Sequence, residues 1–184
     1  METLAKLSGA EFDAMVERGA FEFANPKKVE LIRGELRIMN PAGPVHDDYI
    51  EYLTRWSVAS ADDAAAIRVQ SGLVCEDNRP EPDVVWLKPR RYGRTRPTAD
   101  DVLLLIEVAD SSLLTDLRDK ADVYAEAGVL EYWVIDVQAS RLHRMSGSDG
   151  RTFRVVEVIV PPTQPSPACR PSAQLDLADL FSVK

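Results

Sequence analysis

The chain has 184 residues, with 22 Lys and Arg against 30 Asp and Glu, and a net charge of −8. Its 45% hydrophobic and 28% charged residues are typical of a globular protein and exclude a disordered or fibrous chain. The length suits a single domain over residues 1–184. Because phosphate contacts need Lys and Arg, so acidic a chain is a poor non-specific binder of polyanions. Any role on nucleic acid must therefore depend on a local site.

Two residue types that often build metal or cofactor sites are scarce. Cys75 and Cys169 are far apart and form no CxxC motif, so the sequence supports neither a disulfide framework nor a cysteine zinc site. The two histidines, His46 and His143, are too few for a histidine-rich metal site. The sequence contains no P-loop and no GxGxxG motif, so we expect no nucleotide cofactor.

No segment is typical of a membrane protein. The N-terminus lacks an apolar signal core, and the longest apolar run, VLLLIEVA at 102–109, is too short to span a bilayer. We therefore expect a soluble cytoplasmic protein with no membrane partner.

The first third of the chain predicts a helix, a hairpin and a second helix. A capping-box spacing indicates a helix over about 9–18. Two alternating apolar and polar stretches on either side of Gly34 predict a β-hairpin. Apolar residues recurring on one helical face predict a helix over 44–61, with His46 in its first turn.

The middle of the chain predicts two strands and a loop. Residues 65–77 are typical of a strand with a bulge at Gly72, and residues 81–89 of a second short strand. Residues 88–101 are rich in Arg and also contain Pro and Gly, which predicts an exposed loop.

The clearest unit is a strand at 102–109, a helix at 113–127 and a strand at 131–137. The short joints imply a right-handed βαβ crossover and two parallel neighbouring strands. Residues 141–145 and 152–160 are expected to form antiparallel strands. These elements predict an α/β fold of the α+β kind, in which helices flank a mixed sheet of parallel and antiparallel strands.

The end of the chain differs in composition from the rest. Residues 161–171 contain five prolines and are expected to form an extended connector. Residues 172–181 should then pack back as a short strand or a helical turn. We expect a core at about 20–160 and a proline-rich C-terminal extension at 161–184.

Three carboxylates lie inside predicted sheet elements: Glu107, Asp83 and Glu30. A carboxylate in a buried strand is costly unless something pairs with it, and three acids on sheet elements suggest a site for a hard cation such as Mg²⁺. Each acid also has an ordinary alternative. Glu30 could be a solvent-facing strand residue, Asp83 a turn cap, and Glu107 a core acid satisfied by a salt bridge.

Lys120 could neutralise these acids, because it lies beside the apolar face of the helix predicted at 113–127. The alternative is that Asp116 and Lys120 form an exposed i,i+4 ion pair of little energetic weight. Ser111 and Ser112 precede this helix and fit an N-cap better than a nucleophile, because no GxSxG motif surrounds them.

Separated blocks of sequence follow a specific order along the chain. They are ELIRGEL at 30–36, His46 at a helix start, PDVVWL at 82–87, LIEVADSS at 105–112, then Asp119-Lys120 with Tyr124, and GVLEYWVID at 128–136. In this order they resemble the Uma-type putative restriction endonuclease family, over about residues 20–140. That family belongs to the PD-(D/E)XK nuclease superfamily, which implies a restriction-endonuclease-like fold.

The resemblance implies a divalent-metal phosphodiesterase site acting on DNA. Asp83 would be the acid of the PD element, Glu107 the second acid, and Glu30 the acid of the first element. A standard motif would place its lysine where this chain has Ala109. The resemblance therefore assigns the role of that lysine to Lys120, on the following helix.

The implied chemistry gives each ligand a role. Asp83 and Glu107 would hold Mg²⁺ or Mn²⁺, with the backbone carbonyl of Val108 as a further oxygen ligand. Glu30 would be an outer ligand or would bind a second ion.

Lys120 would orient the attacking water or stabilise developing charge. Tyr124 and His46 are neighbours that match the family, and we expect them to contact the metal ligands and fix their orientation. For His46 a purely structural role is equally open, and His143 is expected to be an ordinary strand residue.

Several alternatives stay open at this point. The loop at 88–96 concentrates five basic residues and could follow a phosphate backbone or simply be solvated. A homodimer is expected, because cutting both strands of a duplex usually takes two sites. Instead of a nuclease, the protein could be a catalytically silent member of the fold that binds or regulates a partner, or a scaffold in a partner complex. The charge of −8 favours the silent binding or regulatory member, whereas the acid, acid and lysine set favours the nuclease.

Overall fold

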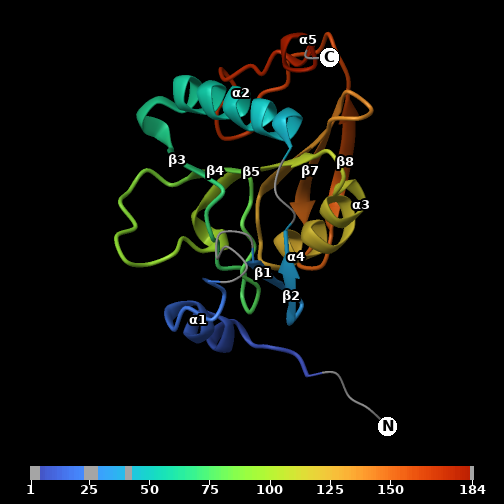
Figure 1. Ribbon diagram of the computed structural model, residues 1–184. Coiled ribbons are helices and arrows are strands. Elements are labelled where there is room, and N and C mark those ends of the chain that lie inside the picture. The colour runs from blue at the N-terminus through green and yellow to red at the C-terminus, as the bar shows by residue number, and fades with distance from the viewer. Residues whose placement is uncertain (1–4, 23–28, 40–42, 183–184) are drawn as a thin grey trace.

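A six-stranded mixed sheet forms the centre of the computed structural model, which describes residues 5–22, 29–39 and 43–182 (Figure 1). The strand order is β3-β4-β5-β6-β7-β8. The strands are β3 (Ala66–Val69), β4 (Val84–Leu87), β5 (Val102–Ala109), β6 (Glu131–Asp136), β7 (Arg141–Ser148) and β8 (Phe153–Ile159). Only β5 and β6 pair in parallel, and the other neighbours are antiparallel. The predicted βαβ unit and the mixed sheet are therefore confirmed.

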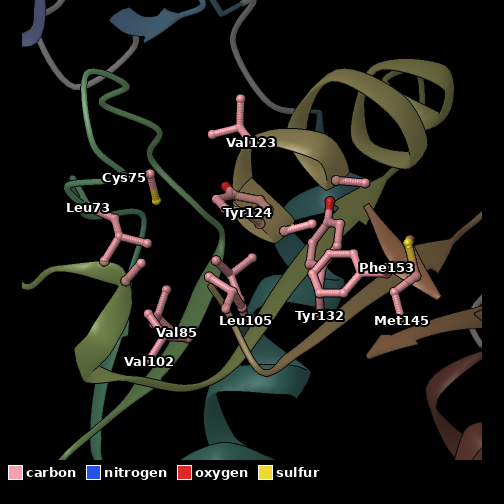
Figure 2. Packing of buried hydrophobic residues seen from close by; sticks show 14 of the residues in the cluster. Leu73, Cys75, Val85, Val102, Leu105, Val123, Tyr124, Tyr132, Met145 and Phe153 are labelled. Atoms are coloured by element: carbon pink, nitrogen blue, oxygen red, sulfur yellow. The ribbon is translucent and has the colours of Figure 1, made fainter. Parts of the chain in front are cut away.

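Helices cover both faces of this sheet, because its strands alternate apolar side chains between two cores. Toward one face, β5 sends Leu104, Ile106 and Val108 against α2 (Pro44–Ala61) and α5 (Leu177–Leu180). Toward the other face, Leu105 packs against α4 (Ala121–Glu126) in the cluster shown in Figure 2. The same alternation directs Glu107 to the α4 face.

The predicted hairpin forms a second, two-stranded sheet of β1 (Val29–Ile32) and β2 (Glu35–Ile38). Arg33 and Gly34 make its turn with φ of 54° and 81°, the left-handed values that a two-residue hairpin turn requires. Ile32 packs into the core on the α4 face, while the other apolar residues of β1 pack against α1 (Gly9–Glu17). The hairpin is thereby fixed on the same side of the sheet as α4.

The strand predicted at 65–77 is too long. Only β3 pairs with β4, and the chain leaves the sheet at Gln70, whose φ is 43°. Leu73 and Cys75 alternate as they would in a strand, but they belong to a loop, and their side chains are buried in the core on the α4 face. No bulge forms at Gly72, where an added Cβ would meet the Arg96 guanidinium 3.2 Å away. Periodicity alone could not distinguish this buried loop from a strand.

The segment expected to be one helix at 113–127 is helical but not uniform. It consists of α3 (Leu113–Thr115), a π-helical turn η5 (Asp116–Lys120) and α4. The loop at 88–101 is exposed at most of its basic residues, but it ends in a short 3-10 turn, η4 (Ala99–Asp101), and buries Tyr92. Arg68 and Arg90 stack on the Tyr92 ring, with guanidinium carbons 5.1 and 4.7 Å from its centroid.

The C-terminal extension packs back onto the α2 face and ends in the helical turn α5. Leu175, Leu177 and Leu180 are buried there, and the Trp56 indole N–H donates to the carbonyl of Gln174 at 3.0 Å. The described part of the chain contains no helix with the length and apolarity needed to cross a membrane. A further 3-10 turn, η3 (Asp62–Ala64), follows α2.

Candidate active site

A buried lysine lies between two buried glutamates on the α4 face of the sheet. The ammonium of Lys120 is 3.0 Å from Glu107 Oε1 and 3.0 Å from Glu30 Oε1. All three residues are 3% exposed or less. They come from the helical segment, from β5 and from β1, so the fold brings together three elements that are distant in sequence.

Asp83 joins this group from the residue before β4. The β4–β5 register pairs Val84 with Ile106, and continuing it by one residue places Asp83 opposite Glu107. The backbone N–H of Val108 donates to Asp83 Oδ2 at 2.8 Å. His46 Nε2 lies 3.3 Å from the same oxygen, which places the first turn of α2 against the site.

Asp116 adds a fourth buried acid from the π-helical turn. Its carboxylate accepts a hydrogen bond from the Ser112 hydroxyl at 2.5 Å, and the residue is 2% exposed. Ser112 occupies the N-cap position of α3, as expected, but its side chain holds Asp116 rather than capping the helix. Single π turns inside helices are frequent at functional sites.

Two tyrosines hold the acids and the turn from inside the core. The Tyr124 hydroxyl donates to Glu107 Oε1 at 2.8 Å, and the Tyr132 hydroxyl donates to the backbone carbonyl of Asp116 at 3.1 Å. Their rings meet edge to face with centroids 5.0 Å apart (Figure 2). The floor of the site is therefore rigidly packed.

The cluster has more acids than it can neutralise. Burial raises the pKa of Glu107 well above its ordinary value, and neighbouring acids add to this effect while Lys120 opposes it. Burial also raises the pKa of Asp116. Burial alone would raise the pKa of Asp83, but the hydrogen bond and charge of His46 hold that pKa below its ordinary value. Burial would lower the pKa of Lys120, but the surrounding carboxylates raise it, so the lysine stays charged.

The cluster opens into a pocket of about 640 Å³. Among the residues that line it are His46, Asp83, Glu107, Val108 and Lys120. Glu30 and Tyr124 are not among the lining residues and lie beneath them in contact with Lys120 and Glu107. A substrate group entering the pocket would meet carboxylate oxygens, an ammonium and an imidazole.

The family model described as putative restriction endonuclease, Uma2, matches residues 10–178 of this sequence. The chain belongs to this family. No curated protein matches it.

Among solved structures, the chain is similar to a putative nuclease belonging to DUF820 from Anabaena variabilis. The two share 16% sequence identity with a TM-score of 0.73 over 96% of this chain and 98% of the other. This likeness confirms the expected fold class, a nuclease-like mixed sheet with flanking helices. The family match confirms the resemblance seen in the sequence.

The structure brings together all the site residues that were predicted from the sequence of this family member. Asp83, Glu107, Lys120 and Glu30 form the cluster, with Val108 and His46 against Asp83 and Tyr124 against Glu107. Three ordinary alternatives are wrong: Glu30 is not solvent-facing, Asp83 is not a turn cap, and Lys120 is not exposed. The alternative for Glu107, a core acid in a salt bridge, stays open because Lys120 forms that ion pair. The roles of these residues stay predictions.

Two residues at the site escaped the sequence analysis. Asp116 was considered only as the exposed partner of Lys120, because nothing in the local sequence indicates the π-helical turn that buries it. Arg37 lines the pocket from β2, and its position follows from pairing with Glu30 across the hairpin. His143, expected to be an ordinary strand residue, lies on β7 with Nε2 3.6 Å from Asp136 Oδ2.

The donor atoms fit a hard divalent cation that keeps several of its waters. Among residues 5–22, 29–39 and 43–182, no group of three or more His, Cys, Asp and Glu side chains is placed to hold a metal ion. Mg²⁺, however, often takes only one or two carboxylates from the protein, and Asp83 and Glu107 provide two at the pocket wall. In the described structure Glu30 Oε2 is also buried without a hydrogen-bond partner, as expected where the buried acids outnumber the positive charges.

Proposed function

We propose that the protein is a metal-dependent nuclease that hydrolyses DNA phosphodiester bonds. The observation that carries this proposal is the buried Lys120 ammonium, 3.0 Å from both Glu107 and Glu30, beside Asp83 at the floor of the pocket. The chain belongs to a family described as putative restriction endonuclease. Acids and a lysine at a pocket suit phosphodiester hydrolysis.

Asp83 and Glu107 would hold Mg²⁺ or Mn²⁺, with the backbone carbonyl of Val108 as a further oxygen ligand. Glu30 would be an outer ligand, since its Oε1 already accepts from Lys120 and from the Glu81 backbone N–H at 2.7 Å. When bound, the divalent ion supplies Lewis acidity toward a phosphoryl oxygen and lowers the pKa of a water molecule.

Lys120 provides the fixed positive charge of the site. Its raised pKa keeps it protonated, so it can stabilise the negative charge that develops on the phosphoryl group or orient the attacking water. Tyr124 keeps Glu107 in place through its 2.8 Å hydrogen bond. His46 favours the ionised form of Asp83, the form that binds a cation.

DNA is the substrate that this proposal names, and a homodimer is its expected working form. The acidic chain argues against binding by charge alone, so the substrate must be held at the pocket. Two copies would supply the two sites that cutting both strands of a duplex requires.

The competing function is a silent member of the family in which Lys120 only neutralises buried acids. Plasmid and single-stranded DNA are incubated with the wild type, Asp83→Asn and Lys120→Ala in Mg²⁺ or Mn²⁺. The proposal predicts cleavage by the wild type that EDTA abolishes and that each variant reduces by about 100-fold or more. Cleavage that the variants retain would come from another site or a contaminant. Absence of cleavage on every substrate would favour the silent alternative.

A further inference from the structure

The pocket is mostly negative, although its proposed substrate is a phosphodiester. Within the described part of the chain, Asp83, Glu107, Asp110, Asp116 and Asp119 line it, against two basic side chains, Arg37 and Lys120. Lys120 is engaged with Glu107 and Glu30, and its side chain is only 3% exposed. Beyond the divalent ion proposed at Asp83 and Glu107, an approaching phosphate group would be stabilised by a further cation at the pocket wall, and Arg37 is placed to supply it.

Arg37 reaches the pocket because of its place in the hairpin. It pairs with Glu30 across β1 and β2, and residues paired in this way project from the same face of a sheet. Arg37 therefore lies on the face that carries Glu30 into the acid cluster. Its side chain is 26% exposed, so a ligand in the pocket can reach it.

Arg37 currently binds an acid at the pocket wall. Its Nη2 lies 2.7 Å from Oδ2 of Asp119, whose side chain is 48% exposed. An ion pair this open to solvent is weak. A guanidinium presents five N–H donors in a planar fork that matches a phosphate as well as it matches a carboxylate. Asp119 thus occupies the group that a phosphate would use.

We propose that Arg37 binds a phosphate of the DNA backbone next to the scissile bond, and that Asp119 competes with that phosphate for the guanidinium. This inference rests on the proposed nuclease function and names a substrate-binding residue for the same site. Asp119 then weakens substrate binding, because the DNA phosphate must displace the Asp119 carboxylate from Arg37 and is repelled by its negative charge.

A structural tether is the alternative role for the same ion pair. Arg37 and Asp119 join the hairpin to the π-helical turn, and a tether would be damaged equally by losing either partner. The proposed role predicts opposite effects. Removing Arg37 weakens DNA binding, whereas neutralising Asp119 strengthens it.

The hairpin also provides matched controls. Arg33, at the hairpin turn, pairs with Glu126 at 3.0 Å and with Asp122 at 4.0 Å and is not among the residues that line the pocket. Arg33→Gln and Asp122→Asn therefore remove charges of the same kind from the hairpin and from α4, which follows the π-helical turn, at residues that do not line the pocket.

The test measures both binding and cleavage with the full chain. Binding of a fluorescent DNA duplex and of its single strand is followed by anisotropy between 50 and 200 mM salt, and cleavage is followed in Mg²⁺. Arg37→Gln is expected to weaken binding about tenfold and to reduce the salt dependence by about one phosphate contact. It should raise KM more than it lowers kcat. Asp119→Asn should strengthen binding by about threefold, and the two control variants should match the wild type.

The outcomes separate this inference from the function on which it rests. If the wild type neither binds nor cleaves DNA, the proposed function fails and the role of Arg37 fails with it. If the wild type cleaves, but Arg37→Gln and Asp119→Asn shift binding in the same direction or leave it unchanged, only the role of Arg37 is overturned. Equal losses of thermal stability in the two variants, with weaker binding in both, would identify a tether.

Discussion

Two neighbouring strands each bury a glutamate, and the two glutamates have opposite surroundings. Glu107 on β5 and Glu131 on β6 are both 3% exposed, on opposite faces of the sheet. Glu131 accepts from the Trp133 indole N–H and from the Ala168 backbone N–H, each at 2.7 Å. Glu107 instead shares one lysine with several other acids at the edge of a pocket.

The difference separates a structural acid from a functional one. Both oxygens of Glu131 are satisfied by neutral donors, and the bond to Ala168 fixes the C-terminal extension to the sheet. The acids around Glu107 repel one another, and one ammonium does not offset them all. An excess of buried negative charge at a pocket is typical of a site that is completed by a cation. Substitutions of the two acids should therefore differ in their effect on stability as well as on activity.

The largest expected effect comes from removing the lysine. Lys120→Met leaves Glu107 and Glu30 buried without their cation, which should destabilise the protein by about 3–5 kcal/mol. Urea unfolding of the two proteins in EDTA measures this difference. A loss below about 1 kcal/mol would mean that the ion pairs are not buried as described.

The next largest effect tests the structural acid. Glu131→Gln weakens two buried hydrogen bonds and places an amide N–H₂ against an N–H donor, so it should cost about 1–3 kcal/mol of stability. It should also loosen the C-terminal extension, which hydrogen exchange at Ala168 would detect as faster exchange. Unchanged exchange there would show that the extension is held by its apolar contacts alone.

The same substitution in β5 should act in the opposite direction. Glu107→Gln removes one of the mutually repelling charges, while its amide still accepts from Lys120 and Tyr124. In EDTA it should raise the free energy of unfolding by about 1 kcal/mol. A loss of stability as large as that of Glu131→Gln would make Glu107 a structural acid.

The gain from Glu107→Gln should also depend on pH. The folded-state pKa of Glu107 lies above its ordinary value of 4.5 because of burial. A group with a raised pKa stabilises the fold fully below the ordinary value and loses that contribution as pH rises through the folded pKa. The wild type should therefore become less stable than the variant, by an increasing margin, as pH rises above about 4.5. Thermal unfolding of both proteins from pH 4 to 8 measures this change. A difference in melting temperature that stays constant over this range would show that Glu107 does not titrate in this way.

The smallest effect is the stabilisation by metal. Mg²⁺ or Mn²⁺ should raise the melting temperature of the wild type in proportion to the logarithm of concentration above its dissociation constant. Asp83→Asn should lose this response, and Glu131→Gln should keep it. An equal response in all three proteins would place the ion at another site.

The sequence predicted the elements whose signals are local. The hairpin at Gly34, the α2 helix and the βαβ unit follow from periodicity and turn residues, and the nominated residues followed from the order of the blocks. The π-helical turn was not predictable, since residues 116–120 contain no Gly or Pro and the turn is held by contacts such as the Tyr132 bond to Asp116. Arg37 was missed because its place in the site depends on the register of the hairpin and on how the hairpin sits against α4.

The most direct test of the account compares DNA cleavage by the wild type, Glu107→Gln and Glu131→Gln, at a temperature where unfolding curves show all three to be folded. We expect metal-dependent cleavage by the wild type, near wild-type cleavage by Glu131→Gln, and a loss of about 100-fold or more in Glu107→Gln despite its greater stability. Equal activity in the two variants would contradict the assignment of Glu107 to the active site.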